Sequence, residues 1–378
     1  MKKYLYTPGP TQVPLEVAIE GLYPIMHHRS SGFSKIFDEV CADLKDIFKT
    51  KADVLCFSST GTGVMESVVV NLLAKNEEVL IVRGGKFGNR WVELCETFDA
   101  NVTVIDIEWG KSINPDQIEK ILNKKSNIKH VFLTHCETST GVLTDIKRIS
   151  EITRNYNSFI IVDAITTIGA QAFYMDEWKI DVAIAASHKG FMLPPGLACV
   201  AISERAKRQI MATNIPRYYF DFRKMLESLK KSTTTYTPAV SLIRSLKKSI
   251  EIIKEEGLEN TWLRHERLAM ATREAVQALG LELFTKENWS NVLTAVKVPE
   301  TINGIKLIEI MKNKYGVIIA GGQAHLKGKI FRIGHLGFIS DFDIIIVISA
   351  LERALVDLGM NIKIGSGVTR VQEVFTDY

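Results

Sequence analysis

The sequence predicts an α/β fold in which a large domain with a mainly parallel seven-stranded sheet is followed by a smaller α+β C-terminal domain. Two observations predict it. Seven short apolar runs between residues 54 and 202 alternate with longer segments of helical periodicity, as in sheets that helices cover on both faces. Beyond residue 256 strands become sparse and helices long. We therefore expect an extended N-terminal segment over residues 1–14, a large domain over 15–256 and a small domain over 257–378.

The large domain is defined by its predicted strands. They are Val54–Phe57, Val79–Val82, Val102–Ile105, His130–Thr134, Phe159–Asp163, Val182–Ala186 and Leu197–Ile202. The segments between them carry apolar residues at three- and four-residue steps, and the same pattern runs from Ile36 to Phe48 before the first strand. The prolines of the first 14 residues predict an extended start to the chain.

The small domain begins after a long predicted helix. This helix covers Ala239–Glu256, and Gly257 is expected to end it. The elements predicted after it are helix 262–279, strand Leu293–Val298, helix 304–314, strand Lys329–Ile333 and helix 342–358.

Composition excludes several classes of protein. The chain has 378 residues and a net charge of +4, and its basic residues are spread along it, so no nucleic-acid partner is expected. Its five cysteines include no CxxC pair, which argues against a disulfide framework or a structural zinc site. The N-terminus lacks the apolar run of a signal peptide, and no run of about 18 apolar residues predicts a membrane span. We expect a cytoplasmic enzyme without a metal or a membrane partner.

Polar or glycine-rich loops follow five of the predicted strands. Because ligands of open α/β sheets bind at the carboxyl ends of the strands, these loops are expected to share one crevice. The first, Ser58–Gly63, combines glycines, hydroxyls and a following helix, which together suit a phosphate group. It matches neither a dinucleotide fingerprint nor a P-loop, and a simple helix-capping turn is the alternative. In the second, Gly84–Arg90, Phe87 lies between glycines and is either a ring-stacking residue or a core anchor.

The third loop, Thr134–Gly141, contains His135, Cys136 and Glu137 in succession. Consecutive residues of an extended segment point to opposite faces, so these three do not chelate one metal ion readily. The loop is expected to hydrogen-bond a ligand through its hydroxyls, with a plain turn as the alternative.

The last two loops carry an acid and an amine. Asp163 ends an apolar strand, where a carboxylate is costly to bury without a cationic partner such as a protonated pyridine nitrogen. The alternatives are a helix cap and a structural ion pair. Lys189 lies between an apolar strand and the rigid segment Leu193–Gly196. Loss of solvation there would lower the pKa of its amine and favour imine formation, whereas the alternative is a surface lysine. One cofactor, pyridoxal 5′-phosphate, needs a phosphate cradle, a stacking ring, a hydroxyl donor, a carboxylate and an imine-forming lysine together.

Eight motifs then identify a family. In chain order they are Thr7-Pro8-Gly9-Pro10-Thr11, His28-Arg29-Ser30, Thr60–Glu66, Phe87-Gly88-Asn89-Arg90, His135–Gly141, Val162-Asp163, Ser187-His188-Lys189-Gly190 and Phe331-Arg332-Ile333-Gly334. The run resembles the class V aminotransferases, in the branch of the alanine–glyoxylate, serine–glyoxylate and serine–pyruvate enzymes. The resemblance covers essentially the whole chain. It implies the fold-type I, aspartate aminotransferase-like architecture of pyridoxal phosphate-dependent transferases, and a homodimer whose active sites lie at the subunit interface.

The resemblance also implies a role for each matching residue. Lys189 would form the Schiff base, Asp163 would pair with the pyridine nitrogen, and Phe87 would stack on the ring. The remaining cofactor contacts would come from Thr60, Gly61, Thr62, Thr138, His188, Tyr236 and Thr237. Arg332 and Gly9 would bind the substrate, the arginine through its α-carboxylate.

Two positions depart from the family pattern. His188 stands where many relatives have glutamine. The stretch Thr235–Pro238, which would reach the neighbouring subunit's phosphate, differs in spacing by about one residue, so the hydroxyl that reaches is open between Tyr236 and its neighbours.

The expected activity is amino-group transfer from a small amino acid, such as alanine or serine, to a 2-oxo acid such as glyoxylate or pyruvate. The resemblance implies a ping-pong aldimine/ketimine mechanism and a place in amino acid metabolism. An aminophosphonate–pyruvate transaminase shares most of the motifs, and a non-catalytic anion-binding α/β protein is the alternative from another class. A cysteine desulfurase would need a nucleophilic cysteine on a loop in the second half of the chain. All five cysteines lie at or before Cys199, which belongs to a predicted strand, and the corresponding region reads Gly321-Gly322-Gln323-Ala324-His325. The donor and acceptor stay open, with His28, Arg29 and His335 as candidate specificity residues.

Overall fold

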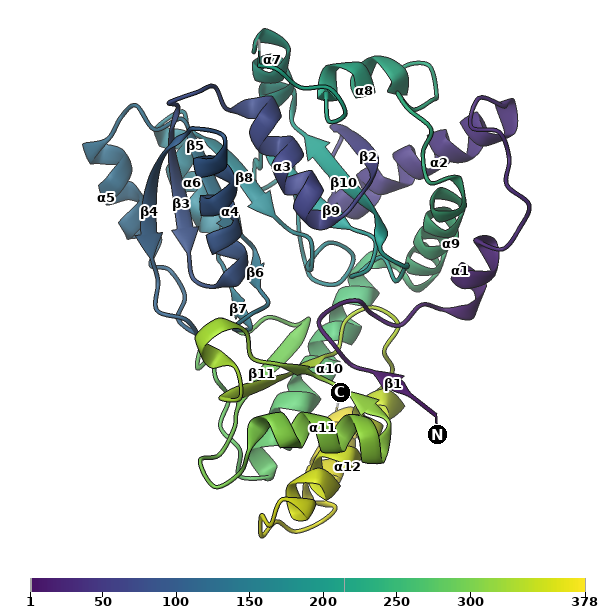
Figure 1. Cartoon of the computed structure of the whole chain (residues 1–378), viewed down its shortest axis with the longest axis vertical. Coiled ribbons are helices and arrows are strands. Elements are labelled where there is room, and N and C mark those ends of the chain that lie inside the picture. Colours follow the sequence, from purple (N-terminus) through teal and green to yellow (C-terminus); the bar gives the residue numbers. More distant parts are fainter. Residues whose placement is uncertain (1, 214, 378) are drawn as a thin grey trace.

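A computed structural model describes residues 2–213 and 215–377, so Met1 and Tyr378, which bound the predicted segments, lie outside the described residues. The chain forms two lobes (Figure 1). The upper lobe holds a seven-stranded sheet between helices. The lower lobe holds the C-terminal third of the chain together with the N-terminal strand.

All seven predicted strands of the large sheet form. They are β2 (Asp53–Ser59), β3 (Glu78–Arg83), β4 (Asn101–Asp106), β5 (His130–Thr134), β8 (Phe159–Asp163), β9 (Val182–Ala186) and β10 (Gly196–Ile202). Their order across the sheet is β2-β10-β9-β8-β5-β3-β4. Strand β10 runs antiparallel to both of its neighbours, and the remaining pairs are parallel. The carboxyl ends of the six parallel strands therefore share one edge, which is where β10 begins.

Helices cover both faces of this sheet (Figure 1). One layer contains α1 (Leu15–Glu20), α2 (Ser31–Phe48), α5 (Asp116–Lys124), α6 (Ile146–Asn155) and α9 (Val240–Glu256). The other contains α3 (Gly61–Leu72), α4 (Lys86–Thr97), α7 (Glu204–Ala212) and α8 (Phe222–Leu229). Along β2, Val54 and Cys56 belong to the first core and Leu55 and Phe57 to the second. This alternation is the two-residue period of a strand that is buried on both faces.

The N-terminal segment is extended, as predicted, and it joins the lower lobe. Strand β1 (Tyr4–Leu5) pairs in parallel with β12 (Val317–Ile318). The amide of Gly334 donates to the carbonyl of Tyr6 at 2.8 Å, and the Tyr6 ring is buried in the C-terminal core. Helix α1 begins directly after Pro14. The predicted division between domains at residue 256 stays a prediction.

The predicted elements of the lower lobe also form. They are α10 (Leu258–Ala278), β11 (Leu293–Lys297), α11 (Gly304–Tyr315), β14 (Ile330–Gly334) and α12 (Asp341–Asp357). Helix α10 begins four residues before its predicted start, because Gly257, with φ +87°, ends α9 and leads directly into α10. Strands β11 and β13 (Ala320–Gly321) flank β14 in an antiparallel sheet.

Several short or C-terminal elements were not predicted. They are the hairpin β6 (Cys136–Glu137) and β7 (Val142–Leu143), the strands β1, β12 and β13, the 3₁₀ turn Ala324–Leu326 and helix α13 (Ser366–Asp377). Helix α13 begins where buried Glu352 of α12 accepts hydrogen bonds from the amides of Gly365, Gly367 and Val368 at 2.8, 2.8 and 3.1 Å. A carboxylate of α12 thus binds amides at the N-terminus of α13, which have no partner within their own helix. The sequence around α13 does not reveal this contact. Within residues 2–213 and 215–377, every helix is too short or too polar to cross a membrane.

Candidate active site

The predicted polar loops meet at the carboxyl edge of the large sheet. Thr134 at the end of β5 lies beside Asp163 at the end of β8, and Asp163 pairs in register with Ile184 of β9. On the other side of β9, Gly196 begins β10 opposite Ser59, where β2 ends. The loops after β2, β3, β5, β8 and β9 therefore surround one location, as the sequence predicts.

Lys189 is buried in this location under the N-terminal segment. Its amine donates to the carbonyl oxygen of Pro8 at 2.6 Å, and its own carbonyl accepts from the Thr11 hydroxyl at 3.1 Å. Burial lowers the pKa of Lys189 to about 8, although the charge of Asp163 opposes the shift. Gly9 has φ +133°, and a Cβ atom there would overlap the end of the Lys189 side chain. The Gly9 backbone thus lies against the Lys189 amine.

Asp163 is a buried carboxylate with room for a further hydrogen-bond donor. Its Oδ1 accepts from the Ile165 amide at 2.9 Å, while no described donor binds Oδ2. Burial raises the pKa of Asp163 to about 6, and the positive charges of Arg90 and Lys189 oppose this rise. A cationic N–H donor would remove the cost of burying this charge.

The loop after β2 forms an anion cradle at the start of α3. Thr60 is the N-cap residue, and its hydroxyl accepts from the Gly63 amide at 3.1 Å. The first amides of a helix have no carbonyl one turn earlier, so those of Gly61 and Thr62 are available for an anion. A Cβ atom at Gly61 would lie 2.7 Å from Cδ1 of Ile165, so a larger residue there would require the Ile165 side chain to move.

Phe87 is held at the start of α4 by the turn after β5. The amides of Phe87 and Gly88 each donate to Oε2 of Glu137 at 3.0 Å. The Arg90 guanidinium lies over the Phe87 ring, 4.9 Å from its centre. The backbone that carries the predicted stacking ring is therefore held by Glu137.

Arg332 of β14 brings the lower lobe to the same location. Its side chain is buried and donates to the carbonyl of Gly321 at 3.0 and 2.7 Å and to that of Thr138 at 2.6 Å. Burial lowers the pKa of Arg332 to about 10, and the negative charge of Glu137 opposes the shift. Three of its five N–H donors are used in these bonds, so two are available for a carboxylate.

His188 and Thr138 complete this group. The Nδ1 atom of His188 is buried and has no hydrogen-bond partner among the described residues. Burial lowers the pKa of His188 to about 4, so its ring is neutral at pH 7. Thr138 is buried, and the bond that the structure gives it comes from Arg332 to its carbonyl.

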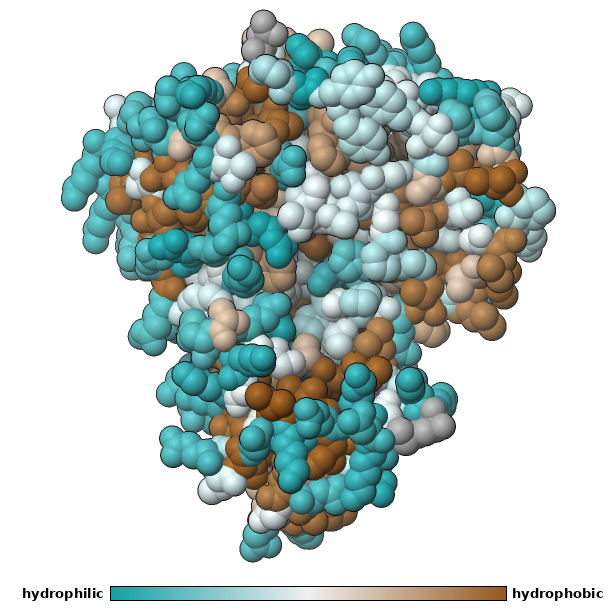
Figure 2. Space-filling view, in the orientation of Figure 1, coloured by the Kyte–Doolittle hydropathy of each residue, from teal (hydrophilic) through white to brown (hydrophobic). Residues whose placement is uncertain are grey.

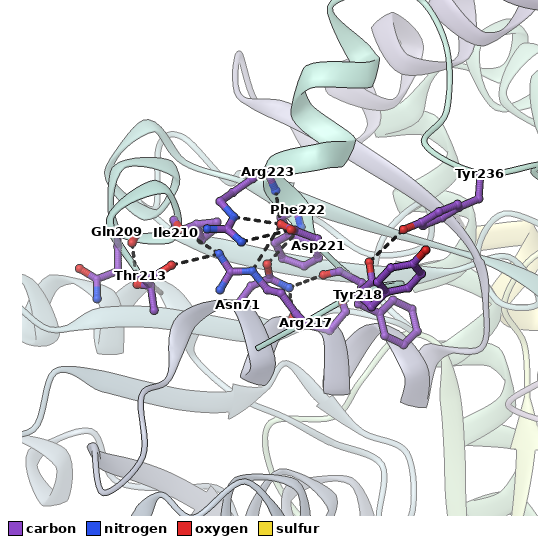
Figure 3. Close-up of polar contacts among 12 residues, drawn as sticks. Asn71, Gln209, Ile210, Thr213, Arg217, Tyr218, Asp221, Phe222, Arg223 and Tyr236 are labelled. Carbon is purple, nitrogen blue, oxygen red and sulfur yellow. Dashed lines mark hydrogen bonds and ion pairs between the residues drawn. The ribbon is translucent and has the colours of Figure 1, made fainter. Parts of the chain in front are cut away.

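Tyr236 and Thr237 lie at the edge of the candidate site, beside the loop after β2. The Tyr236 hydroxyl donates to the carbonyl of Tyr218 at 3.2 Å (Figure 3). The Tyr236 ring stacks on the rings of Tyr218 and Tyr219, with centroids 5.9 and 5.5 Å away. The Tyr219 hydroxyl donates to the carbonyl of Ser58 at 3.3 Å. Thr237 is exposed, and its hydroxyl lies 3.5 Å from Nε2 of His28.

A buried ionic network holds the tyrosine-bearing segment in place (Figure 3). Asp221 accepts from the Arg223 side chain at 3.1 and 3.2 Å and from Nε of Arg217 at 3.4 Å. The Asn71 side chain donates to the Phe220 carbonyl at 2.5 Å and accepts from the Phe222 amide at 3.1 Å. Helix α3 therefore supports both the anion cradle and the tyrosine segment.

The three candidate specificity residues have different surroundings, and Nε2 of the first, His28, lies 3.5 Å from the Thr237 hydroxyl. His335 is fully buried, with Nε2 3.0 Å from the Thr294 hydroxyl and Nδ1 3.1 Å from the Asn291 carbonyl, so both nitrogens are engaged within the small-lobe sheet. Arg29 donates to the Thr233 hydroxyl at 2.5 Å and to the Thr234 carbonyl at 2.7 Å. It supports the segment that carries Tyr236 and Thr237.

Sequence reasoning missed the role of Glu137 and of the Pro8 carbonyl. The sequence places Glu137 in a turn expected to bind a ligand, without a role of its own, and in the structure its carboxylate binds the amides at the start of α4. His135 binds the Thr167 hydroxyl at 2.8 Å. In the part of the chain that the structure describes, no group of three or more His, Cys, Asp or Glu side chains could hold a metal ion.

These residues fit pyridoxal 5′-phosphate. Asp163 has an oxygen without a partner among the described donors, which could accept from the ring nitrogen of the cofactor. The amides of Gly61 and Thr62 suit the phosphate of the cofactor. Lys189 is a buried amine whose pKa is close to neutral. The buried Nδ1 of His188 is a further polar atom that a bound group would satisfy.

Comparison with known proteins agrees with this arrangement. The family model described as Aminotransferase class-V matches residues 3–335. The Soluble hydrogenase 42 kDa subunit of Anabaena cylindrica is 41% identical over 100% of this chain and 99% of its own. The L-aspartate–glyoxylate aminotransferase of Paracoccus denitrificans is 37% identical over 98% of this chain and 95% of its own.

A solved structure extends the agreement to three dimensions. The ureidoglycine–glyoxylate aminotransferase from Bacillus subtilis superimposes with a TM-score of 0.95 and 30% identity, over 100% of this chain and 98% of that one. The motifs, the lysine and aspartate at the sheet edge and the whole-chain similarity have one common explanation. This chain belongs to the class V aminotransferases, with their α/β fold and their amino-group transfer chemistry.

Proposed function

We propose that this aminotransferase moves the amino group of a small amino acid to a 2-oxo acid, with glyoxylate or pyruvate as acceptor, and that Lys189 and Asp163 hold pyridoxal 5′-phosphate. The observation that carries the proposal is the buried Lys189 amine, which follows β9, at the same sheet edge as the buried Asp163 carboxylate, which ends the neighbouring strand β8. The names of two similar proteins contain glyoxylate as acceptor, whereas their amino donors differ. We therefore propose glyoxylate first and a donor of small size, such as alanine or serine.

Each residue then has a task. Pyridoxal phosphate supplies an aldehyde for amine exchange and a ring that withdraws electrons. Asp163 would accept a hydrogen bond from the ring nitrogen and would favour its protonated form. Lys189 Nζ accepts a proton from the α-carbon of the bound amino acid as a general base and later donates it as a general acid, which a pKa near 8 favours. Arg332 binds the α-carboxylate with its free N–H groups.

We propose the other cofactor contacts from the family resemblance and from the place of these residues at the sheet edge. Thr60, Gly61 and Thr62 would bind the phosphate at the start of α3, with His188 donating from its ring. Phe87 would stack on the ring, and Thr138 would contact its 3′-oxygen side. The Gly9 backbone would cover the substrate next to Lys189 and exclude water.

We infer a homodimer, supported by an exposed apolar patch at α1. Its members are Leu15, Ile19, Leu22, Tyr23 and Ile25, with exposed fractions from 41% to 83%. Figure 2 shows hydrophobic surface on the side where Figure 1 places α1. A patch of this kind is typical of a subunit interface.

The segment Thr234–Thr237 would reach the phosphate of the partner subunit. The hydroxyls of Thr234, Thr235 and Tyr236 are bonded within the chain, to the Tyr236 carbonyl, to Ser228 and to the Tyr218 carbonyl respectively. Thr237 is exposed, and its hydroxyl has a longer contact within the chain than these three, 3.5 Å to Nε2 of His28, so we propose that it reaches the partner's phosphate. A cytoplasmic location would agree with five reduced, buried cysteines.

The test is an absorbance spectrum of the purified protein with pyridoxal phosphate, before and after addition of alanine, serine, aspartate and 2-aminoethylphosphonate. We expect a visible band that one donor removes and glyoxylate restores. Lys189→Ala should lack the band, whereas Lys286→Ala, which changes a side chain that is 80% exposed, should keep it. A colourless wild-type protein would contradict the proposal, and loss of the band only with 2-aminoethylphosphonate would indicate an aminophosphonate transaminase.

A further inference from the structure

Glu137 is a buried acid to which no task in the transfer reaction has been assigned. It has 5% of its surface exposed, and it follows strand β5, whose last residue Thr134 pairs with Asp163 of β8. Oε2 accepts from the amides of Phe87 and Gly88, each at 3.0 Å. Oε1 accepts from the amide and the hydroxyl of Ser139 at 3.2 and 2.5 Å. Burial raises the pKa of Glu137, and the hydrogen bonds from Ser139, Gly88 and Phe87 oppose that rise because donors favour the ionised carboxylate.

The carboxylate replaces an N-cap side chain that helix α4 lacks. The N-cap residue is Gly85, which has no side chain to accept from the first amides. The Lys86 amide donates to the Ser139 hydroxyl at 3.1 Å, and the next two amides donate to Glu137. The first turn of α4 is therefore capped by the turn after β5, and the charge lies at the positive end of the helix.

This contact requires close approach of two backbones. A Cβ atom at Gly85 would overlap both the Glu137 side chain and the Ser139 hydroxyl. The Glu137 carbonyl accepts from the amides of Thr140 and Gly141 at 3.0 and 2.8 Å, which closes the turn. Glu137 is thus fixed at its backbone as well as at its carboxylate.

The same turn reaches the substrate arginine. The residue after Glu137 is Thr138, whose carbonyl accepts from Nη1 of Arg332 at 2.6 Å. The Glu137 charge also stabilises the buried Arg332 cation, because it opposes the lowering of the Arg332 pKa by burial. One turn therefore joins the stacking ring of the upper lobe to the carboxylate-binding arginine of the lower lobe.

We propose that Glu137 is a positioning residue that holds Phe87 against the cofactor ring and Arg332 at the substrate carboxylate. This inference rests on the proposed function, since both partners act only when cofactor and amino acid are bound. Loss of the Glu137 charge should loosen the first turn of α4 and weaken ring stacking. It should also release Arg332 from one of its two anchoring points, the Thr138 carbonyl.

The test compares Glu137→Gln with a matched control, Glu352→Gln. Glu352 is also buried and also accepts from three amides at a helix start, but at α13 in the lower lobe. Both variants lose charge-assisted caps and should lose thermal stability. Only Glu137→Gln should weaken pyridoxal phosphate binding, by roughly 10- to 100-fold, the loss expected for broken hydrogen bonds to a charged group. It should also reduce the visible circular dichroism of the bound cofactor and raise KM for the amino acid more than it lowers kcat.

Ser139→Ala is the second variant, and it tests the positioning role of Glu137 if Glu137→Gln does not fold. It keeps the carboxylate but removes the hydroxyl between Glu137 and the Lys86 amide, so a smaller effect in the same direction is expected. If wild type binds the cofactor while the folded variants keep its dissociation constant and dichroism, the positioning role is wrong and the proposed function stands. If Glu352→Gln weakens the cofactor equally, the effect is general destabilisation and the proposal is overturned. A wild-type protein that takes up no pyridoxal phosphate overturns the proposed function and this inference with it.

Discussion

The backbone of Gly9 lies directly against the side chain of Lys189. The Lys189 amine donates to the carbonyl of the preceding residue, Pro8, at 2.6 Å, and a Cβ atom at Gly9 would overlap this amine. The N-terminal segment reaches this position because β1 pairs with β12 in the lower lobe. The first residues of the chain thus form one wall of the candidate active site.

Gly9→Ala should disrupt the site more than it disrupts the fold. The methyl group would displace Lys189. We therefore expect the affinity for pyridoxal phosphate, measured by the visible cofactor band, to fall at least about tenfold. Gly280→Ala is the control, since Gly280 also has a positive φ, +73°, but nothing lies within 4 Å of its Cβ position. A titration with pyridoxal phosphate followed by absorbance measures both. Equal losses of cofactor affinity in the two variants would show that backbone strain, and not contact with Lys189, causes the effect.

Lys189→Met should stabilise the protein in a pH-dependent way when no pyridoxal phosphate is added. Folding lowers the pKa of Lys189 from 10.5 to about 8, so its contribution to stability is greatest above pH 10.5 and is lost as the pH falls to about 8. At pH 7 the variant should exceed wild type by about 3 kcal/mol in the free energy of unfolding. The difference should shrink towards pH 10.5. Urea unfolding at pH 7, 9 and 10 tests this, and a difference independent of pH would contradict it.

Asp221→Asn should destabilise the tyrosine segment of Figure 3. Asp221 has 3% of its surface exposed and compensates the buried Arg217 and the Arg223 side chain. Removing its charge leaves Arg217 uncompensated, at a cost of about 3 kcal/mol. Asp106→Asn breaks an exposed pair with Arg83 and should cost less than about 1 kcal/mol. Thermal and urea unfolding of the two variants provide the comparison, and equal losses would place Asp221 in a solvated pair.

Thr237→Ala should weaken binding of pyridoxal phosphate, by about tenfold for one lost hydrogen bond to a charged phosphate. Thr235→Ala is the control, because the Thr235 hydroxyl is occupied by Ser228 at 3.2 Å and by the Met225 sulfur at 3.1 Å. The dissociation constant is measured at a protein concentration where dimers form. If Thr235→Ala has the larger effect, the hydroxyl that reaches the partner's phosphate has been misassigned.

Leu22→Glu should separate the subunits. Leu22 is 83% exposed in the α1 patch, and burying a glutamate in its place would be unfavourable. Ile364→Glu, at a position that is 55% exposed outside the patch, is the control. Size-exclusion chromatography with light scattering should show monomers for the first variant and dimers for the second. Dimers that persist in Leu22→Glu would place the interface elsewhere.

Much of the site was predictable because each of its parts is local. Thr60–Gly63, Phe87, Asp163 and Lys189 each follow a strand whose apolar run is visible in the sequence, and parallel strands bring their carboxyl ends to one edge. Helix α10 was placed four residues late, because its first turn follows Gly257 without a loop.

Other features were not predictable from local patterns. Helix α13 depends on Glu352 of α12, and the hairpin β6–β7 has strands of two residues each. His335 resembled a site residue by its place after Arg332, yet both of its nitrogens are engaged with Thr294 and Asn291. The sequence around a residue does not show which side chains from distant segments will contact it.

The sequence alone determined the α/β class, the seven strands and the chemistry of the loops that follow them, because strand burial and cofactor chemistry depend on residue type and spacing. Only the tertiary structure decided which groups act on one another. Pro8 meets Lys189 across 181 positions, and Thr138 meets Arg332 across 194. These contacts are made by chain segments that fold against each other, so burial, and with it the pKa of Lys189, Asp163 and Arg332, is a property of the assembled site.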